Sequence, residues 1–310
     1  MKKYFLSANT SSGYISFYDE TMKNLEKSYI LSDLSEAEAS TVIFNISDIY
    51  GADEIILNPM NTNLADGCIL SKKKLGIFSK RTKIFPEQTD DLSGLYTAYG
   101  EAKKIHDEWE KIYIENMDTV RLNSYQDKII YEILKDLHGC GKTENINRFF
   151  GASTPFKPVN FINELTEDLE SRYFIKGRPG TGKSTFLKRF RNEAIKRGFD
   201  TETYFCSFDP KSLDMVVVRE LSVCIFDSTA PHEMFPESKR DCILDFYTEA
   251  GLEGIDEKYD DELKKKATDY KEKVNEGLGY LKKIYENMNI TENIEKEKTA
   301  TEELKTLLDE

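Results

Sequence analysis

The sequence RYFIKGRPGTGKSTFLK, residues 172–188, decides the fold class of this chain. It contains the pattern G-x-x-x-x-G-K-S, whose defined positions are Gly177, Gly182, Lys183 and Ser184. An apolar run at 173–175 comes before the pattern, and an amphipathic helical pattern follows it from residue 186. Strand, glycine-rich loop and helix in this order are the context of a phosphate-binding loop.

The residues of this loop have predicted roles in holding a nucleotide. Glycines let successive backbone N–H groups turn towards a phosphate where a Cβ atom would clash. The helix N-terminus adds unpaired N–H groups and the positive end of its dipole. We expect Lys183 to contact the β- and γ-phosphates and the Ser184 hydroxyl to ligate Mg²⁺. The residues expected to bind ATP are Gly177, Arg178, Pro179, Gly180, Thr181, Gly182, Lys183, Ser184 and Thr185.

A second metal-binding residue is expected where a downstream strand ends. The apolar runs 215–218 and 222–226 are typical of strands, and the second of them ends in Asp227. A carboxylate at the C-terminal edge of a strand beside a phosphate loop is suited to hold the water shell of Mg²⁺. Asp227 is therefore predicted to be a metal ligand and a catalytic residue. Asp214 is a weaker alternative as a metal or substrate ligand, and it is equally compatible with an ordinary turn.

The residues after Asp227 include a further catalytic candidate. Many motor ATPases place a glutamate directly after this aspartate to polarise the attacking water, but this chain has a serine there. The loop STAPHEMFPE (228–237) brings His232 and Glu233 just beyond the expected metal edge. Either side chain could orient a water or contact a substrate, and either is compatible with an exposed loop. His232 joins Lys183 and Asp227 as a candidate catalytic residue.

The first half of the chain repeats the second. SYILSDLSEAEASTVIF (28–44) aligns without a gap to residues 172–188, at a shift of 144 positions, and the alignment holds from about residue 4 to residue 46. With small gaps, later matches keep the same order, such as FPE at 85–87 and 235–237, and KIYIENM at 111–117 with KIYENM at 283–288. We infer two P-loop-like halves with a boundary near residue 145.

The first copy of the loop lacks the groups that bind phosphate. The positions of Gly177, Gly180, Gly182 and Lys183 are taken by Asp33, Glu36, Glu38 and Ala39. The three carboxylates would repel a polyphosphate, and loss of the lysine removes a charge-assisted hydrogen bond of roughly 1.5–3 kcal/mol. Ser79 stands where the second copy has Asp227. We expect no nucleotide site in the first half, with Glu36 and Glu38 capping the helix instead.

These patterns predict an α/β protein with two tandem P-loop NTPase-like domains and mostly parallel sheets. The degenerate domain covers 1–145, with a helical segment at about 94–137, and the active domain covers 146–310, with one at about 240–310. Both segments are rich in Lys and Glu and are expected to form hairpins or lids beside the P-loop cores. Within the first segment, HDEWE (106–110) is interpreted as an amphipathic helix with a solvated acidic face rather than as a metal site.

Composition limits the partners and the compartment. A formal net charge of −13 argues against sequence-independent binding of nucleic acid, which needs a basic face. The five cysteines show no C-x-x-C spacing, which is typical of reduced thiols rather than disulfides or zinc ligands. Neither a signal peptide nor a membrane span is indicated by any apolar run. A cytoplasmic protein without a membrane partner is expected.

Three motifs and the tandem arrangement resemble one bacterial family. The motifs are RYFIKGRPGTGKSTFLK (172–188), SLDMVVVRELSVCIFDSTAPHEMFP (212–236) and KIHDEWEKIYIENM (104–117). They are similar to those of double P-loop proteins that are labelled predicted ATPases or nucleotide kinases, and the resemblance covers nearly the whole chain. It implies nucleotide contacts from Gly177 to Thr185 and a metal role for Asp227. Members of the family commonly keep an intact loop in the first copy, and this chain departs from them at 33–39.

Three functions are compatible with these features. The leading hypothesis is Mg²⁺-dependent ATP hydrolysis at a single site in the second half, with the first half as a structural or regulatory partner and Arg81 as the arginine that completes the site. An alternative is a kinase that transfers the γ-phosphoryl group to a nucleotide or another small molecule bound near Asp214 and His232. The third is a nucleotide-gated scaffold with negligible turnover, whose acidic helices bind a protein partner.

Overall fold

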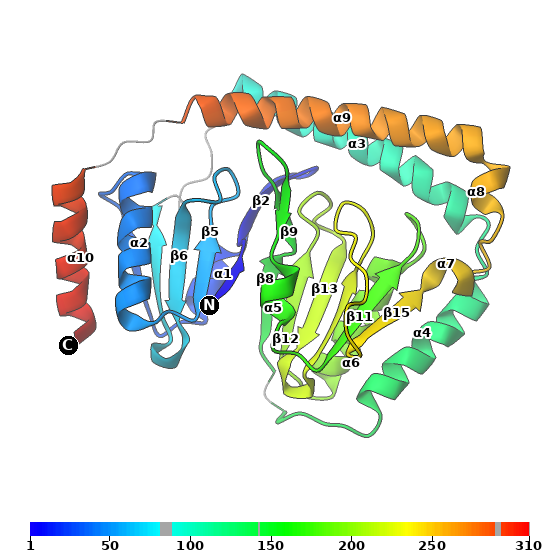
Figure 1. Ribbon diagram of the computed structural model, residues 1–310, viewed down its shortest axis with the longest axis horizontal. Coiled ribbons are helices and arrows are strands. Elements are labelled where there is room, and N and C mark those ends of the chain that lie inside the picture. Colours follow the sequence, from blue (N-terminus) through cyan, green and yellow to red (C-terminus); the bar gives the residue numbers. More distant parts are fainter. Residues whose placement is uncertain (81–88, 142, 289–292, 310) are drawn as a thin grey trace.

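The computed structural model describes residues 1–80, 89–141, 143–288 and 293–309. Within these ranges the chain is a mixed α/β structure with two large β-sheets side by side, and two long helices run across the top of both (Figure 1). Arg81 and the FPE sequence of the first repeat lie outside the described residues.

The first sheet is formed by the N-terminal part of the chain. Across the sheet its strands are β1 (Lys2–Tyr4), β5 (Glu54–Leu57), β6 (Ala65–Leu70), β7 (Leu75–Ser79) and β4 (Lys27–Leu31). The outer pairs β1–β5 and β4–β7 are parallel, whereas β6 runs antiparallel to both neighbours. Alternate side chains enter two different apolar clusters, so that Ile77 and Phe78 point to opposite faces and both are fully buried.

In the second sheet, the strand that precedes the predicted phosphate loop lies near one edge. Across it the strands are β15 (Asp241–Asp245), β11 (Ser171–Lys176), β14 (Val223–Asp227), β13 (Leu213–Val218), β12 (Thr201–Phe205) and β8 (Asn145–Phe149). Three of its pairings are parallel and two are antiparallel. Over the two large sheets, five of the nine pairings are therefore parallel, so the predicted excess of parallel pairing is confirmed by a narrow margin.

The strand β15 lies in the segment from residue 240 onward that was expected to be helical, and that expectation was wrong there. The strand pairs in parallel with β11, and Arg172 of β11 donates two hydrogen bonds, of 2.7 and 2.9 Å, to the Asp241 carboxylate. This bidentate ion pair fixes the register and offsets the low strand propensity of an acidic residue. Asp245 then ends the strand and caps α7 (Phe246–Glu249), which leads to α8 (Ile255–Lys258).

The two sheets have the same internal order. If β15 is set aside, β1-β5-β6-β7-β4 corresponds strand by strand to β8-β12-β13-β14-β11. Irregularities in strand pairing recur at matching places in the two sheets. The pairing register shifts at Ile56/Leu57 in the first sheet and at Tyr204/Phe205 in the second. The 3-10 turns Ser71–Lys73 and Arg219–Leu221 are each followed by a left-handed residue, namely Lys74 (φ 46°) and Ser222 (φ 54°).

Helices and hairpins follow the same correspondence. The helix α2 (Glu36–Tyr50) lies on the first sheet, and α6 (Lys183–Lys196) lies on the second. The hairpin of β2 (Ser7–Thr10) and β3 (Gly13–Ser16) and the helix α1 (Tyr18–Lys23) match β9 (Gly151–Ser153), β10 (Pro158–Asn160) and α5 (Ile162–Thr166).

The two halves pack around an approximate two-fold axis. Phe5 and Phe149, which are equivalent in the repeat, form an antiparallel bridge between the halves. Across the top of both sheets, α3 (Asp90–Ile114) and α9 (Asp260–Glu286) pair along their length. The pairing is antiparallel, because Glu108 contacts Lys266 while Glu101 contacts Lys273.

Each half sends one helix across to the other half. α4 (Thr119–Leu134) follows the first sheet in sequence but packs on α6 and α7, whereas α10 (Ile294–Asp309), the last helix, packs on α2. The apolar face of α4 joins Phe186 and Phe190 in one core, and Leu304 and Leu308 of α10 complete the other. The helical segments were expected to lie each beside the core of its own half. Instead, α4 and α10 are exchanged between the halves, and α3 pairs with α9 (Figure 1).

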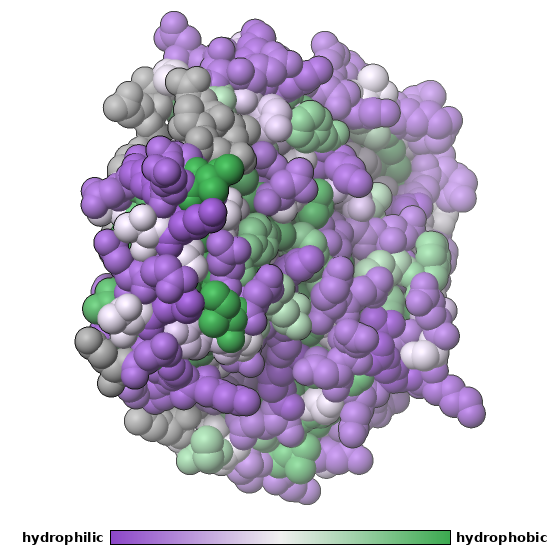
Figure 2. Space-filling view, turned by 60° about the vertical axis from the view of Figure 1, so that its left-hand side comes forward, coloured by the Kyte–Doolittle hydropathy of each residue, from purple (hydrophilic) through white to green (hydrophobic). Residues whose placement is uncertain are grey.

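The surface is mostly hydrophilic, as expected when most large apolar side chains are buried in these cores. Hydrophilic residues cover most of the face in Figure 2, and the apolar ones are scattered among them. Of the helices that the structure describes, none is both long enough and apolar enough to cross a membrane.

Candidate functional site

The loop between β11 and α6 has the backbone that its glycines predict. Gly180 and Gly182 adopt φ values of 78° and 75°, a region that residues with a Cβ atom avoid. At Gly177 a Cβ atom would lie 2.5 Å from the Thr181 hydroxyl, and this hydroxyl donates a hydrogen bond of 2.8 Å to the carbonyl of Arg178. The loop therefore closes on itself and ends at the N-terminus of α6, where Gly182 is the N-cap.

Lys183 connects the loop to the strand that carries Asp227. Its Nζ donates a hydrogen bond of 3.0 Å to the carbonyl of Arg178 and lies 3.6 Å from Oδ2 of Asp227. The Lys183 side chain is only 11% exposed, so its charge is held at the mouth of the loop. The lysine and the strand aspartate thus lie together at one edge of the sheet, where a triphosphate and its cation would need both.

The hydroxyl of Ser184 brings a third polar group to the same edge. Ser184 Oγ accepts a hydrogen bond of 2.9 Å from the backbone N–H of Leu213, the first residue of β13. The next residue, Asp214, is buried, and its burial and the negative charge of Asp227 raise its pKa well above the ordinary value. The structure therefore places Asp214, the weaker sequence candidate, in the same cluster as Ser184 and Asp227.

Arg178 fixes the loop to neighbouring helices. Its guanidinium donates two hydrogen bonds, of 2.9 and 2.5 Å, to Oδ2 of Asp256 on α8. The hydroxyl of Tyr113, near the end of α3, donates a hydrogen bond of 2.8 Å to the other oxygen of the same carboxylate. Asp256 of α8 therefore links the predicted phosphate loop to α3, although it was not singled out in the sequence.

His232 lies against a hairpin. Its Nδ1 is 3.0 Å from Nδ2 of Asn160, and its ring meets that of Phe150 edge to face at 4.9 Å. Burial lowers the pKa of His232, which favours the neutral ring, while the Asp227 carboxylate acts in the opposite direction. These contacts hold the imidazole at the β9–β10 side of the 228–237 loop, and its catalytic role stays a prediction.

The segment HDEWE of α3 packs on the predicted phosphate loop. A Cβ atom at Gly180 would lie 2.6 Å from the carbonyl oxygen of Glu110 and 3.1 Å from its Cα, so the helix touches the top of the loop. The side chains of His106 and Glu110 are about one third exposed or less, and Lys183 acts electrostatically on the pKa of both. The interpretation of this segment as an amphipathic helix with a solvated acidic face holds for Asp107 and Glu108, which are exposed, whereas His106 and Glu110 are partly buried.

The sequence indicated that His106 and Glu110 share one helix face, but it did not show which element that face contacts. His106 and Glu110 are spaced i, i+4, which puts them on one face of a helix. A partner for that face was not visible, because the helix crosses to the other half of the chain. The only sequence feature that points to close contact is Gly180, whose position excludes a side chain.

The first copy of the loop has become part of a helix. α2 begins at Glu36, the counterpart of Gly180, whereas α6 begins one turn later in the repeat, at Lys183. Ser35 is the N-cap, and Glu38 completes a capping box, because its Oε2 accepts a hydrogen bond of 2.7 Å from the Ser35 N–H and its own N–H donates one of 3.2 Å to Ser35 Oγ. Capping by Glu38 is confirmed, and Glu36 lies in the first turn.

A lysine from α10 reaches this capped helix end. Lys296 Nζ lies 3.6 Å from Oε2 of Glu38 and donates a hydrogen bond to the carbonyl of Asp33. The backbone N–H of Ser35 and the charge of Lys296 lower the pKa of Glu38, which is 5% exposed. A carboxylate and an ammonium group of the chain itself thus lie at the position that corresponds to the predicted phosphate loop of the second copy.

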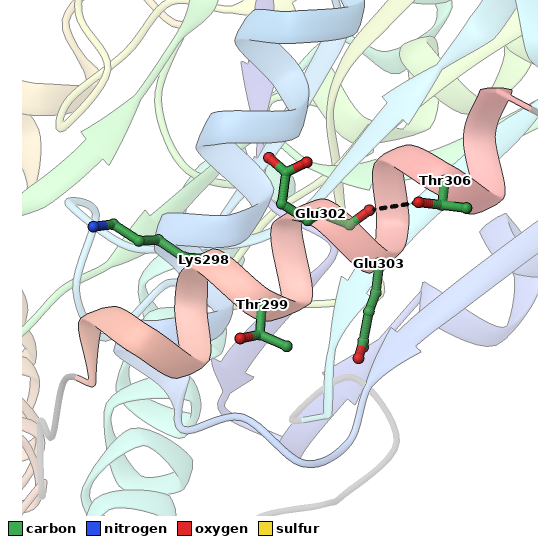
Figure 3. A pocket seen from close by; sticks show the side chains of 5 residues that line it. All are labelled: Lys298, Thr299, Glu302, Glu303 and Thr306. Carbon is green, nitrogen blue, oxygen red and sulfur yellow. Dashed lines mark hydrogen bonds between the residues drawn. The ribbon is translucent and has the colours of Figure 1, made fainter.

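A shallow hollow on α10 has no features of a site. It is lined by Lys298, Thr299, Glu302, Glu303 and Thr306, all from one helix (Figure 3). The hydroxyl of Thr306 donates a hydrogen bond of 3.1 Å to the carbonyl of Glu302, an ordinary bond within the helix, and the side chains do not converge on one point.

Comparisons with protein-family models, with curated proteins and with solved structures found no match to this chain.

Proposed function

We propose that the chain consists of two P-loop domains and that the second binds ATP with Mg²⁺ and hydrolyses it. The observation that supports this most strongly is the contact between Lys183 and Asp227, at 3.6 Å, beside a loop with two left-handed glycines at a helix N-terminus. Backbone N–H groups, a lysine and a metal-binding carboxylate are the three components that phosphoryl transfer from a nucleotide requires.

The donor set fits Mg²⁺. Ser184, Asp214 and Asp227 offer one hydroxyl and two carboxylates, and Mg²⁺ prefers oxygen ligands of this kind, directly or through water. A divalent cation would also stabilise the two neighbouring carboxylates, since burial and the charge of Asp227 raise the pKa of Asp214. When bound, the cation would supply charge neutralisation for the phosphates, while Lys183 would hold the β- and γ-phosphate oxygens.

The first domain is proposed to have no nucleotide site. Its helix α2 starts where the phosphate loop would be, and Glu38 already satisfies the backbone N–H of Ser35. The resemblance to double P-loop proteins agrees with this arrangement for the second copy, and the exchange of glycine for glutamate in the first copy explains the departure from that family.

Binding of ATP by Lys183→Ala tests the proposal. Loss of the charge-assisted hydrogen bonds is expected to weaken binding of a fluorescent ATP analogue by about 10- to 150-fold at constant Mg²⁺, which corresponds to roughly 1.5–3 kcal/mol. Lys196→Ala is the matched control, because Lys196 belongs to the same helix but is 79% exposed at its far end. Equal binding by Lys183→Ala and the wild-type chain would disprove the proposal.

The phosphoryl acceptor is tested by measuring ADP release with ATP alone and with a panel of nucleosides and nucleotides. Hydrolysis predicts release with water as the only acceptor and a dependence on Mg²⁺. Release that requires an added nucleotide would instead assign the protein to the kinases.

A further inference from the structure

The position after Asp227, where many ATPases carry a catalytic glutamate, has a structural role in this chain. Ser228 is buried, and its hydroxyl donates a hydrogen bond of 2.9 Å to the carbonyl of Met234 and accepts one of 3.1 Å from the Met234 N–H. These bonds close the loop after β14 and offer no carboxylate to an attacking water. A group that accepts the proton of that water must come from another element.

The helix α3 brings a carboxylate-bearing residue into contact with the loop. The Glu110 backbone lies against Gly180, at 2.6 Å from an ideal Cβ atom to the Glu110 carbonyl oxygen. The Glu110 carboxylate lies 3.5 Å from Nδ1 of His106, and the charge of Lys183 acts on both side chains. The predicted phosphate ligand Lys183 and this carboxylate therefore belong to one electrostatic cluster.

The other groups around Glu110 are already paired. Asp107 forms an ion pair with Lys103, and Lys103 lies 3.4 Å from Asp209, in the loop before β13. Although His106, Asp107 and Glu110 have ligand atoms within 4.8 Å of one another, this ammonium group holds the place next to Asp107 that a metal ion would take. Glu110 faces a neutral imidazole instead, since burial lowers the pKa of His106.

We propose that Glu110 is the general base of the reaction, an inference that rests on the proposed function. In this step the oxygen of water attacks the γ-phosphorus of ATP, and the bond from the γ-phosphorus to the β-γ bridging oxygen breaks, so that ADP leaves with the electron pair. The water proton passes to the Glu110 carboxylate and from there to solvent or to the inorganic phosphate. His106 positions the carboxylate through its Nδ1 contact.

This assignment gives the half without a nucleotide site a role in catalysis. The N-terminal part of α3 is anchored on the first half, where Tyr96 donates a hydrogen bond of 3.0 Å to Oδ1 of Asn9, and where Leu92 and Leu95 share a core with Met60. The C-terminal part of the same helix carries Glu110 to the loop of the second half. The first half thus supplies the catalytic carboxylate of the second.

Glu110→Gln tests the inference, since it keeps the shape of the side chain and removes its basicity. We expect ATP turnover to fall by about 100-fold or more while the Kd for the Mg²⁺-bound ATP analogue stays within about threefold of the wild-type value. Glu108→Gln is the matched control, because Glu108 lies on the same helix, pairs with Lys266 of α9 and is 56% exposed. It should turn over ATP like the wild-type chain.

The possible outcomes distinguish failure of the proposed role of Glu110 from failure of the proposed ATP site. Turnover by Glu110→Gln within threefold of the wild type, with Lys183→Ala still defective in binding, would overturn the role of Glu110 and leave the ATP site standing. Loss of binding together with turnover in Glu110→Gln would also overturn it, because a base is not needed for binding. Absence of turnover by the wild-type chain, with every acceptor tried, would remove the step that Glu110 is proposed to catalyse.

Discussion

Phe149 donates its backbone N–H to the carbonyl of Phe5 at 2.9 Å, and the two residues occupy the same position in the two repeats. The chain therefore pairs with itself as two subunits of a symmetric dimer would. Next to this bridge, Arg148 donates hydrogen bonds to Glu54 of the first half, at 2.8 Å, and to Glu202 of the second, at 3.0 Å. The seam between the halves is thus both apolar and charged.

Arg148→Ala should destabilise the whole chain. The Arg148 side chain is 3% exposed, and its removal leaves Glu54 and Glu202 without their shared cation in a buried place. The expected loss is about 3–5 kcal/mol in the free energy of unfolding, measured by urea denaturation. Arg121→Ala, on the surface of α4, is the control and should change this energy by less than about 1 kcal/mol. A small effect of Arg148→Ala would contradict the role of the seam.

The same seam predicts a pH dependence of stability. Burial alone would raise the pKa of Glu202, but Arg148 and Arg219 together bring it down to about 2, from 4.5. Because the folded pKa is the lower one, the stabilisation is present above pH 4.5 and is lost as the pH falls from there to about 2. Its size is about 3 kcal/mol. Urea denaturation from pH 6 to pH 2.5 should show this loss of stability. In Glu202→Gln, most of this pH dependence should be absent.

Glu38→Ala should cost about 1 kcal/mol of stability, the usual value of a lost cap interaction, because it removes the bond to the Ser35 N–H.

Ala39→Lys, which restores the loop lysine, should not create a second ATP site, since α2 already begins at Glu36. Titration of the fluorescent ATP analogue should therefore show one site in both variants. Two molecules of the ATP analogue bound per chain of Ala39→Lys would contradict the proposal that the first half has no nucleotide site.

Gly180→Ala should weaken ATP binding and stability together. The residue has a φ of 78°, and a Cβ atom would meet the Glu110 carbonyl at 2.6 Å, so both backbone strain and a clash with α3 oppose the change. We expect a loss of more than about 1 kcal/mol in the free energy of unfolding. Gly100→Ala is the matched control, since a Cβ there meets no atom within 4 Å and the residue lies inside α3; it should be neutral or stabilising.

Turnover should fall at acidic pH because of Glu110. Burial raises the pKa of its carboxylate, and Asp107 and Asp209 act in the same direction, whereas Lys103 and Lys183 oppose it. A base with a raised pKa is protonated, and therefore inactive, at a higher pH than an exposed glutamate would be. The rate of ADP release should thus fall as the pH drops through this raised value.

The residual rate of Glu110→Gln is the control for this profile, and it should not show the same acidic limb. A wild-type profile that stays flat down to the ordinary pKa range of an exposed glutamate would contradict the assignment.

The local parts of this structure could be predicted from the sequence. The strands around 215–218 and 222–226, and the helix that follows Gly182, have apolar patterns whose period decides their type. The position of Asp227 next to Lys183 follows from the order of loop and strand. These features depend on short stretches of chain, and the structure places them as the patterns indicate.

The exchange of α4 and α10 could not be predicted, and the reason is physical. Both repeats present the same apolar helix positions, such as Val42 and Ile46 on α2 and Phe186 and Phe190 on α6, so a third helix with an apolar stripe suits either core. In the structure α3 pairs with α9, and α4 and α10 follow these two helices in sequence, so their placement involves a long-range pairing that no local pattern contains. Glu110 was missed for the same reason, because its partner lies in the other half.

The carboxylate of Glu38 has a consequence for how the molecule would respond to the proposed nucleotide. At the N-terminus of its helix the first half holds a carboxylate of its own, in contact with the Lys296 ammonium group, and this contact needs no nucleotide. With ATP bound as proposed, the ligand would change the second half alone. The two similar halves would then act as a fixed member and a variable member, and movement on ATP binding could be measured against the first half.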